Sequence, residues 1–336
     1  MSIQENVVRE LVSGRNLALE LVRVSEAAAL AASRWMGLGN KNEADGAAVT
    51  AMRKAFDAVA IDGTVVIGEG EMDEAPMLYI GEKVGRGGPA MDIAVDPLEG
   101  TNLCAKGGPN ALAVIALAER GNFLHAPDIY MDKIAVGGGL PRGVVDIDAS
   151  VEENLRNLAR AKDCDVSDLV ACLLDRDRHE DKINRIRALG ARIMLITDGD
   201  VAGVMATTQP DSGVDIFFGI GGAPEGVLAA AALRCVDGQM QGRLIFENEE
   251  QIQRARDMGI ADPHHKFDIM ELAKGDVLFA ATGVTSGPML RGVHRHGHGA
   301  ITHSVVMRSR SGTVRYIEAH HNYNINPCAQ ALLAGQ

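Results

Sequence analysis

Five acidic residues lie where the sequence predicts that a strand ends or a helix begins. They are Asp45, Glu69, Asp96, Glu99 and Glu225. In layered α/β proteins, ligands gather at strand ends and at helix N-termini. Several carboxylates that converge without histidine or cysteine suit hard cations, so the set predicts Mg²⁺ or Mn²⁺ in place of zinc. Any one of these residues alone could be a helix cap or a solvated surface acid, and it is their joint placement that favours a metal site.

The most specific segment is Asp96-Pro-Leu-Glu-Gly-Thr101. Asp96 follows a predicted strand, Pro97 fixes the direction of the chain, and Gly100 permits a tight turn with close backbone approach. This spacing can direct two carboxylates and the hydroxyl of Thr101 at one small volume. The alternative is an ordinary exit from a strand into a turn.

The first third of the chain predicts two helices and three short strands. Residues 17–35 are rich in Ala, Leu and Val with charges on one side, as in a long helix. In the next helix, Asp45 lies four residues before Val49 on the apolar stripe, so its carboxylate is expected to point inward. Buried strands are expected at residues 64–68, 91–95 and 111–117, and the second of them is expected to end at Asp96.

Beyond residue 137 the sequence alternates strands with helices, which favours an α/β layered architecture. The expected strands are residues 192–197, 214–220 and 277–281, with two more near Val305 and Val314. A polar segment at residues 247–265 is expected to be an exposed helix.

The length of 336 residues favours two domains, because single cores rarely grow past roughly 250–300 residues. We place an N-terminal metal-binding α/β domain at residues 1–145. A C-terminal α/β domain at residues 146–336 would complete the substrate site.

Charge and composition exclude several classes of protein. The formal net charge of −12 makes nucleic acid and anionic membrane surfaces unfavourable partners. A phosphate site would therefore need local positive charge from Lys, Arg, helix N-termini or metal ions. No apolar run approaches the roughly 20 residues that span a bilayer, and the polar N-terminus lacks the apolar centre of a secretion signal. The five cysteines are scattered singly, which suits reduced thiols, so we expect a cytoplasmic protein.

The hexapeptide that begins at Asp96 resembles the D-P-[IL]-[DE]-G-[ST] signature of the lithium-sensitive, metal-dependent phosphatases, which include inositol monophosphatases and fructose-1,6-bisphosphatases. Further segments occur in the order typical of class II, GlpX-type fructose-1,6-bisphosphatases: Lys41–Asp45, Ile67–Gly81, Ala126–Met131, Asp198–Asp200 and Gly219–Gly226. Inositol monophosphatases lack the last of these, G-I-G-G-A-P-E-G. Asn102 resembles the cyanobacterial-type branch, whose members also hydrolyse sedoheptulose-1,7-bisphosphate.

This resemblance implies a fold, a cofactor and an assembly. The fold would be the layered α/β/α/β/α carbohydrate-phosphatase sandwich, the cofactor Mn²⁺ or Mg²⁺, and the assembly a dimer or tetramer of identical chains. The metal ligands would be divided between two ions, with Asp45 and Glu69 at one and Asp96, Glu99 and Glu225 at the other.

The catalytic residues implied by the resemblance are Thr101, Asp73 and Lys41. Phosphate-ester hydrolysis needs an in-line nucleophile, neutralised phosphate charge and a stabilised leaving alkoxide, and two metal ions roughly 3.5–4 Å apart can bind the water and the leaving oxygen together. A threonine hydroxyl cannot act as a free base at neutral pH, so Thr101 would relay a proton to a carboxylate such as Asp73 or Glu71. Lys41 could polarise the phosphate.

The substrate contacts implied by the resemblance come from both halves of the chain. They are Glu99, Gly100, Thr101, Tyr130, Arg176, Asp177, Arg178, Asp198, Gly199, Asp200 and Gly222. Arg178 offers a planar fork suited to a distal phosphate, whereas Asp198 and Asp200 suit sugar hydroxyls because two anions would repel. Asp177 stands where the family more often has proline.

Our leading hypothesis is hydrolysis of the 1-phosphate of fructose-1,6-bisphosphate, with sedoheptulose-1,7-bisphosphate as a second substrate. The alternatives are a phosphatase of inositol phosphates or adenosine bisphosphates, and a catalytically silent sugar-phosphate sensor. Arg176, Arg178 and Tyr130 favour a substrate with a second phosphate. The presence of every candidate metal ligand argues against the silent sensor.

Overall fold

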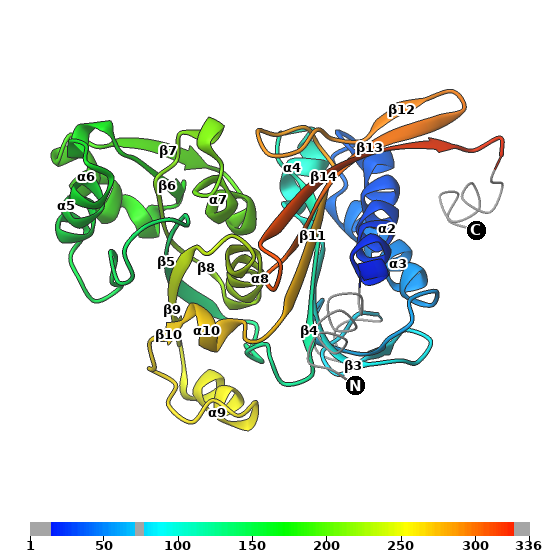
Figure 1. Ribbon diagram of the computed structural model, residues 1–336, viewed down its shortest axis with the longest axis horizontal. Helices are drawn as coiled ribbons and strands as arrows, with labels where there is room; N and C mark the ends of the chain where they lie inside the picture. The colour runs from blue at the N-terminus through cyan, green and yellow to red at the C-terminus, as the bar shows by residue number, and fades with distance from the viewer. Residues whose placement is uncertain (1–14, 71–76, 326–336) are drawn as a thin grey trace, which may run out of the picture.

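The chain folds into alternating layers of helices and sheets (Figure 1). The computed structural model describes residues 15–70 and 77–325. Its α-helices are α2 (Arg15–Ala32), α3 (Lys41–Phe56), α4 (Thr101–Lys106), α5 (Val151–Lys162), α6 (Glu180–Ala188), α7 (Asp200–Ala206), α8 (Ala223–Arg234), α9 (Glu249–Asp257) and α10 (Ile269–Leu272). Short 3₁₀ helices are η1 (Ser33–Trp35), η2 (Val166–Asp168), η3 (Asp177–His179) and η4 (Pro210–Ser212).

The first sheet has the strand order β12-β13-β11-β4-β3-β1-β2, with β14 also paired to β13. Its strands are β1 (Asp62–Ile67), β2 (Lys83–Val84), β3 (Ala90–Glu99), β4 (Leu112–Glu119), β11 (Val277–Gly283), β12 (His294–His296), β13 (Gly299–Arg308) and β14 (Thr313–Asn322). Only the β1–β3 pair is parallel, and the other pairs are antiparallel.

The second sheet has the order β10-β9-β5-β8-β6-β7. Its strands are β5 (Tyr130–Val136), β6 (Val170–Leu174), β7 (Arg192–Ile196), β8 (Ile216–Gly222), β9 (Gln239–Ile245) and β10 (Phe267–Asp268). Strands β6, β7 and β8 run parallel, so the C-terminal ends of these three strands meet at one edge of the sheet.

Five layers alternate across the molecule in Figure 1, from α2 and α3, through the first sheet, a central helical layer and the second sheet, to α5 and α6. Three apolar clusters fill the spaces between them. One joins α2 and α3 to the first sheet, one surrounds α8 between the sheets, and one joins the second sheet to α5 and α6. The α/β/α/β/α layering expected from the resemblance is therefore confirmed.

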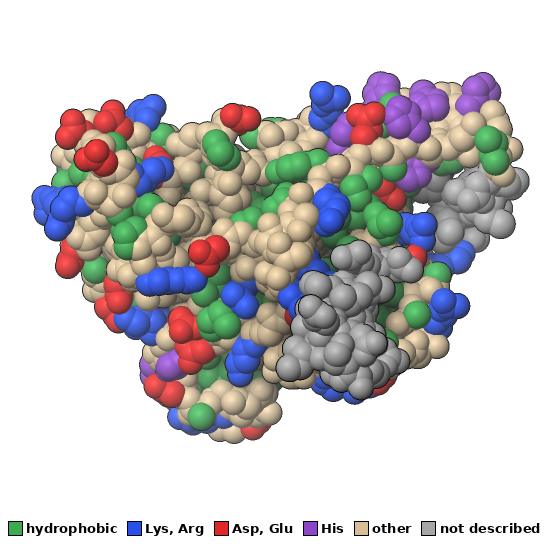
Figure 2. Space-filling view, viewed as in Figure 1, with side chains coloured by type: hydrophobic (Ala, Val, Ile, Leu, Met, Phe, Trp, Pro, Cys, Tyr) green, Lys and Arg blue, Asp and Glu red, His purple; other side chains and the backbone are tan. Residues whose placement is uncertain are grey.

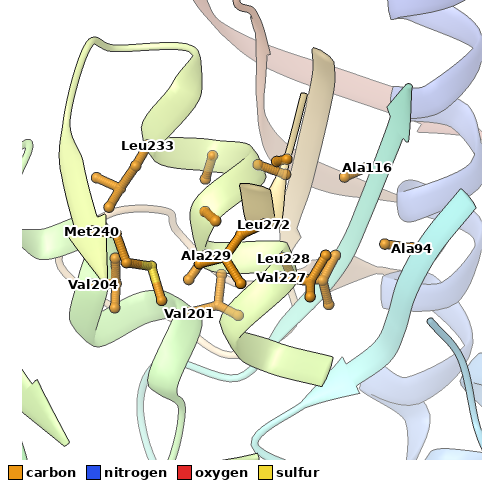
Figure 3. Packing of buried hydrophobic residues seen from close by; sticks show 14 of the residues in the cluster. Ala94, Ala116, Val201, Val204, Val227, Leu228, Ala229, Leu233, Met240 and Leu272 are labelled. Atoms are coloured by element: carbon orange, nitrogen blue, oxygen red, sulfur yellow. The ribbon is translucent and has the colours of Figure 1, made fainter. Parts of the chain in front are cut away.

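Helix α8 forms the centre of the fold because its side chains are small and apolar on every side. Val227 to Leu233 are all buried, including a run of four alanines, so that both sheets approach the helix closely. Figure 3 shows Leu228 facing Ala94 and Ala116 of the first sheet, with Leu233 on the side of Met240. A helix that is apolar all round fits only a layer covered on both faces.

The expected strand at residues 91–95 is longer than predicted. Strand β3 does not end at Asp96 but continues to Glu99, and its register with β4 shifts between Asp96 and Glu99. Proline lacks an N–H for a sheet ladder. Pro97 is tolerated because the neighbouring strand β1 pairs with β3 only as far as Ala94, so that no strand in the described ranges pairs with that edge of β3 at the proline.

The expected helix at residues 247–265 is shorter than predicted, since only α9 is helical there. The residues after α9 form turns, in one of which the carboxylate of Asp262 accepts a hydrogen bond from the N–H of His264 at 3.0 Å. Local side-chain bonds of this kind compete with the helix.

Both sheets take strands from the two sides of residue 145. Strands β11 to β14 return to the first sheet, and β5 pairs in the second sheet between β8 and β9. The division into domains at residues 1–145 and 146–336 stays a prediction. None of the helices in the described residues is long and apolar enough to cross a membrane.

Replacing Leu233 with alanine tests the packing of the central layer. Leu233 is fully buried in α8, and truncating such a leucine leaves a cavity that lowers the free energy of unfolding by about 2–5 kcal/mol. Leu19→Ala is the matched control, because Leu19 lies on α2 with 51% of its surface exposed. Urea denaturation measures both variants, and equal losses would contradict the assigned layering.

Candidate active site

A pocket of about 400 Å³ lies between the two sheets, and 22 residues line it. Its volume is in the range of sites for small organic ligands, roughly 300–1,000 Å³. The wall from the first sheet carries Asp45 of α3, Glu69 after β1, and the segment Asp96 to Thr101. The wall from the second sheet carries Tyr130, Arg176, Arg178, Asp198–Asp200 and Gly221–Glu225. Segments far apart in the sequence therefore share one cavity.

Strand β3 and the turn after it place the hexapeptide at the pocket. The side chain of Asp96 accepts a hydrogen bond from the N–H of Leu98 at 3.1 Å. Gly100 has a left-handed φ of +79° and begins helix α4, so the chain reverses sharply and brings Thr101 back to the pocket. Glu99 is buried, and its Oε1 accepts a hydrogen bond from the N–H of Val201 at 2.8 Å, which joins the first wall to the second.

Glu225 enters the pocket from the first turn of helix α8. Its carboxylate lies directly over Gly222, where an added Cβ would meet Oε2 at 1.8 Å. Any side chain at position 222 would therefore displace Glu225. The helix dipole and Pro224 in the first turn favour an acidic residue at this position.

The carboxylates of the pocket hold their protons more tightly than they would in water. Burial, then the charges of Asp45 and Glu225, raise the pKa of Glu69 to about 8. Burial is also the largest cause that raises the pKa values of Asp45, Asp96, Glu99 and Glu225, and the last three are raised further by neighbouring carboxylates. The pocket thus concentrates negative charge that the protein itself compensates only in part.

The donor set suits a hard divalent cation. Asp45, Glu69, Asp96, Glu99 and Glu225 all line the pocket, as the sequence predicted, and its lining contains no histidine or cysteine. Carboxylate oxygens are the ligands that Mg²⁺ and Mn²⁺ take. As the side chains stand, no three Asp, Glu, His or Cys residues in the described part of the chain form a converged ligand group. A cation would therefore have to draw these carboxylates together.

The opposite wall carries positive charge beside an aromatic ring. The guanidinium of Arg178 lies 4.9 Å from the centroid of the Tyr130 ring. Its Nε and Nη2 donate to the carbonyl oxygen of Ile220 at 2.9 and 2.6 Å, which leaves Nη1 for a ligand. Arg176 also lines the pocket, and its Nη1 donates to the carbonyl oxygen of Asp175 at 3.0 Å. Two arginines at one wall can bind a phosphate group.

Asp200 lines the pocket, but a lysine holds its carboxylate. Lys133 of β5 is fully buried and forms an ion pair with Asp200. The same ammonium donates to the carbonyl oxygen of Gly222 at 2.9 Å. Asp200 is therefore committed to a structural ion pair, whereas Asp198 is half-buried and is the more accessible of the two carboxylates.

Among the described residues singled out by sequence, two do not line this cavity. Lys41 is exposed at the start of α3, and Asp177 is exposed in η3; neither lines the pocket. Asp73 lies outside the described residues. The other candidate residues for metal, substrate and catalysis all line the pocket, including Gly100, Thr101, Gly199 and Gly222.

Sequence reasoning missed two charged residues of this region, Asp128 and Lys133. Asp128 lines the pocket just before β5 and stands within the quoted segment Ala126–Met131, which was the available signal. Lys133 shares one face of β5 with Met131 and Ala135, because residues two apart in a strand point to the same side. The apolar neighbours indicate that this face, and the lysine on it, is buried. Its partner Asp200 is 67 residues away, so no local pattern revealed the pair.

Histidines gather elsewhere on the molecule. Figure 2 shows them over β12, β13 and β14, at the end of the first sheet. There His303 and His320 both contact Glu318, at 3.0 and 2.8 Å. The chemistry of the pocket is accordingly that of carboxylates, arginines and a threonine hydroxyl.

A five-layered α/β fold with an acidic pocket between its two sheets is the architecture of the carbohydrate-phosphatase sandwich. Residues 15–321 match the family described as bacterial fructose-1,6-bisphosphatase, glpX-encoded, and the chain belongs to this family. It is 48% identical over 322 residues to fructose-1,6-bisphosphatase 1 class 2 of Escherichia coli strain K12, a match that covers 91% of this chain and 95% of that protein. The class 2 fructose-1,6-bisphosphatases of Escherichia coli O6:H1 and Shigella flexneri match with the same identity and coverage.

Replacing Lys133 with methionine tests the buried ion pair. The change leaves the charge of Asp200 buried without its partner, and such losses lower the free energy of unfolding by about 3–5 kcal/mol. Adding Asp200→Leu should restore most of the stability, since an apolar pair of similar volume replaces the ion pair.

Lys182→Met is the control, because Lys182 pairs with Asp132 at 2.7 Å while both side chains are about a quarter exposed, at 24% and 28%. Partly exposed pairs contribute about 0–1 kcal/mol. Chemical denaturation compares the variants. Similar small losses for both lysines would show that Lys133 does not carry the stability assigned to it.

Proposed function

We propose that this protein hydrolyses the 1-phosphate of fructose-1,6-bisphosphate to give fructose 6-phosphate and phosphate. The observation that carries the proposal is the composition of the pocket, in which four carboxylates and a threonine on the first wall, with Glu225 of α8 completing the acidic set, face two arginines and a tyrosine on the second wall. The first wall suits cation-assisted chemistry at a phosphate, and the second suits a phosphate at the far end of the substrate. The names of the relatives point to the same activity.

The metal cofactor of this proposal is Mn²⁺ or Mg²⁺. Asp45 and Glu69 would hold one ion, and Asp96, Glu99 and Glu225 a second; all five line the pocket. When bound, such ions would neutralise phosphate charge and lower the pKa of a water molecule. The raised pKa values of the five carboxylates support this assignment, because a nearby cation would relieve the repulsion between them.

The chain's own groups position the reactants. In the reaction a water oxygen forms a bond to phosphorus, the bond from phosphorus to the oxygen on C1 of the sugar breaks, and the released oxygen takes up a proton from solvent to become a hydroxyl. Thr101 would take a proton from the attacking water as its hydroxyl passes its own proton to a carboxylate, for which Asp73 is our candidate. Arg176, Arg178 and Tyr130 would bind the 6-phosphate, so that the scissile phosphate is held against the first wall.

Several finer assignments belong to this proposal. Sedoheptulose-1,7-bisphosphate would be a second substrate, because Asn102 donates to Asp198 at 3.4 Å at the edge of the pocket and could adjust that edge to a longer sugar. Lys41 would polarise the phosphate if the N-terminus of α3 moves toward the pocket.

We further propose that the chain acts in the cytoplasm as a homodimer or homotetramer, with no nucleic-acid or membrane partner.

A phosphate-release assay with defined substrates and metals tests the activity. We expect release from fructose-1,6-bisphosphate with Mn²⁺ or Mg²⁺, and loss of release after chelation that either metal reverses. Inositol 1-phosphate is the control substrate, since it has no second phosphate for Arg176 and Arg178. Release from inositol 1-phosphate alone would favour the inositol-phosphate alternative, and binding of the bisphosphate without release would favour the silent sensor.

Replacing Thr101 with alanine tests its role in moving the proton. Proton transfer by a positioned side chain typically contributes about 10²–10⁴-fold, so we expect turnover to fall by about 100-fold with little change in KM. Thr101→Ser keeps the hydroxyl and serves as the matched variant, with activity near that of the parent protein. Equal turnover in the alanine and serine variants would remove Thr101 from the mechanism.

A further inference from the structure

A fully buried histidine lies behind the arginines of the pocket. His179 is the last residue of η3, and its exposed fraction is 0%. It follows Arg178 directly in the sequence, yet it does not line the pocket. Its only possible influence on a bound substrate is therefore through the residues that it contacts.

Both ring nitrogens of His179 bind backbone groups at the ends of two neighbouring strands. The N–H of Ile220 in β8 donates to Nε2 at 2.8 Å. Because that group can only donate, Nε2 must be unprotonated, and the ring hydrogen lies on Nδ1. Nδ1 then donates to the carbonyl oxygen of Leu174, the last residue of β6, also at 2.8 Å.

These two hydrogen bonds connect β6 and β8 at a point where the two strands have no direct backbone pairing. Strands β6 and β8 pair only at Ala171 with Ile216 and at Cys172 with Phe217. Beyond that point the strands diverge to form the wall of the pocket, and the imidazole bridges the gap between them. Leu174 and Gly221, which stand at the two sides of this bridge, both line the pocket.

Ile220 is held from both sides by consecutive residues of the same short helix. Its N–H binds His179, and its carbonyl oxygen accepts from Nε and Nη2 of Arg178. The residue whose carbonyl oxygen orients the Arg178 guanidinium over Tyr130 is thus itself held at its N–H, in the preceding peptide group, by the histidine. Losing the imidazole bonds would free the segment from Asp175 to His179 to shift, and Arg178 with it.

The bridge requires the neutral imidazole. Burial is the largest cause that lowers the pKa of His179, and it outweighs the opposing hydrogen bond to Leu174. Arg178 on η3 and Lys182 on α6 also lower the pKa, while Asp200 on α7 raises it. A proton on Nε2 would point at the N–H of Ile220, so the bond between them would be lost. The bridge is therefore complete above the ordinary histidine pKa of about 6.5 and fails as the pH falls through the lowered value.

We propose that His179 is a positioning residue that fixes Arg178 for the distal phosphate of the substrate by joining the ends of β6 and β8. The inference rests on the proposed function, because it takes the distal phosphate as the ligand of Arg178. It adds to that function a residue that neither touches the substrate nor lines the pocket.

His179→Phe is the variant that tests the proposal, because it keeps an aromatic ring and removes both hydrogen bonds. We expect KM for fructose-1,6-bisphosphate to rise by about 10–100-fold, as for other losses of supporting contacts, while kcat changes much less. A rise in KM alone is the mark of lost binding that is equal in the ground and transition states. His179→Gln can still accept from Ile220 through its amide oxygen, so its KM should lie between those of the parent and the phenylalanine variant.

His321→Phe is the matched control. His321 is half-buried and also has a lowered pKa, caused by burial and by His320, but it lies in β14 of the first sheet and contacts Thr302. Removing its ring should leave KM unchanged. A rise in KM of the same size in this variant would show a general effect of lost packing and would overturn the proposal.

The pH profile supplies a measurement that needs no destabilised variant. As the pH falls below the ordinary histidine pKa of about 6.5 and through the lowered pKa of His179, KM of the parent and of His321→Phe should rise because the ring takes up its proton. The phosphate groups of the substrate also titrate near pH 6, and the ratio of KM values between variants cancels that contribution. The ratio of His179→Phe to His321→Phe should therefore fall toward one as the pH falls.

The outcomes separate this inference from the function on which it rests. No phosphate release by the parent protein would refute the proposed function. Release by the parent with an unchanged KM in His179→Phe, or with a loss in kcat alone, would refute the role of His179 and leave the function intact. A ratio of KM values that rises, instead of falling, as the pH is lowered would likewise refute the requirement for a neutral ring.

Discussion

The repulsion among carboxylates in one enclosed pocket is the constraint on which the rest of this structure depends. Five acidic side chains from α3, β1, β3 and α8 are held where burial and mutual charge raise their pKa values. Flexible supports would let such groups move apart into water. The structure instead holds them in or just after strands β1 and β3 and in the N-terminal halves of helices α3 and α8, whose backbones are fixed by hydrogen bonding.

The central helix makes this confinement possible. Because α8 carries four consecutive alanines and only two leucines among the residues that it buries between the sheets, the sheets lie close enough for residues of each to share a cavity. Larger side chains in this layer would separate the walls and divide the pocket into two shallow surfaces. The composition of one apolar helix thus determines whether two polar walls can act on one ligand (Figure 3).

Most of the candidate site could be predicted from sequence because its acidic residues stand at the boundaries of elements. Asp45 follows from the apolar stripe of its helix, and Glu69 and Asp96 follow from the ends of strands. Their convergence needed the family resemblance, since spacing along the chain does not show which strands are neighbours. The extent of β3 beyond Asp96 could not be predicted for the same reason. Pro97 is tolerated in β3 because β1 stops pairing with β3 before the proline, and the sequence does not show where that pairing ends.

The contacts that cross between elements were beyond sequence reasoning. The pair of Lys133 with Asp200 and the bridge of His179 between Leu174 and Ile220 each join residues that no local period connects. In both cases the side chain is fully buried and binds groups on another strand or helix. In the sequence, a histidine beside two arginines indicates a charged loop. Only the fold shows that the ends of β6 and β8 lie on the two sides of this histidine.

The return of β11 to the first sheet has a consequence for the synthesis of the protein. Strand β4 pairs with β3 on one side and with β11 on the other. Between the end of β4 at Glu119 and the start of β11 at Val277 lie 157 residues. The ribosome must therefore synthesise strands β5 to β10, which form the second sheet, before β11 can pair with β4 in the first sheet. Until then the edge of β4, which is apolar along nearly its whole length, has no partner. Contacts so distant in sequence slow folding and leave unpaired strands open to association, so the nascent chain is most vulnerable to aggregation midway through its translation.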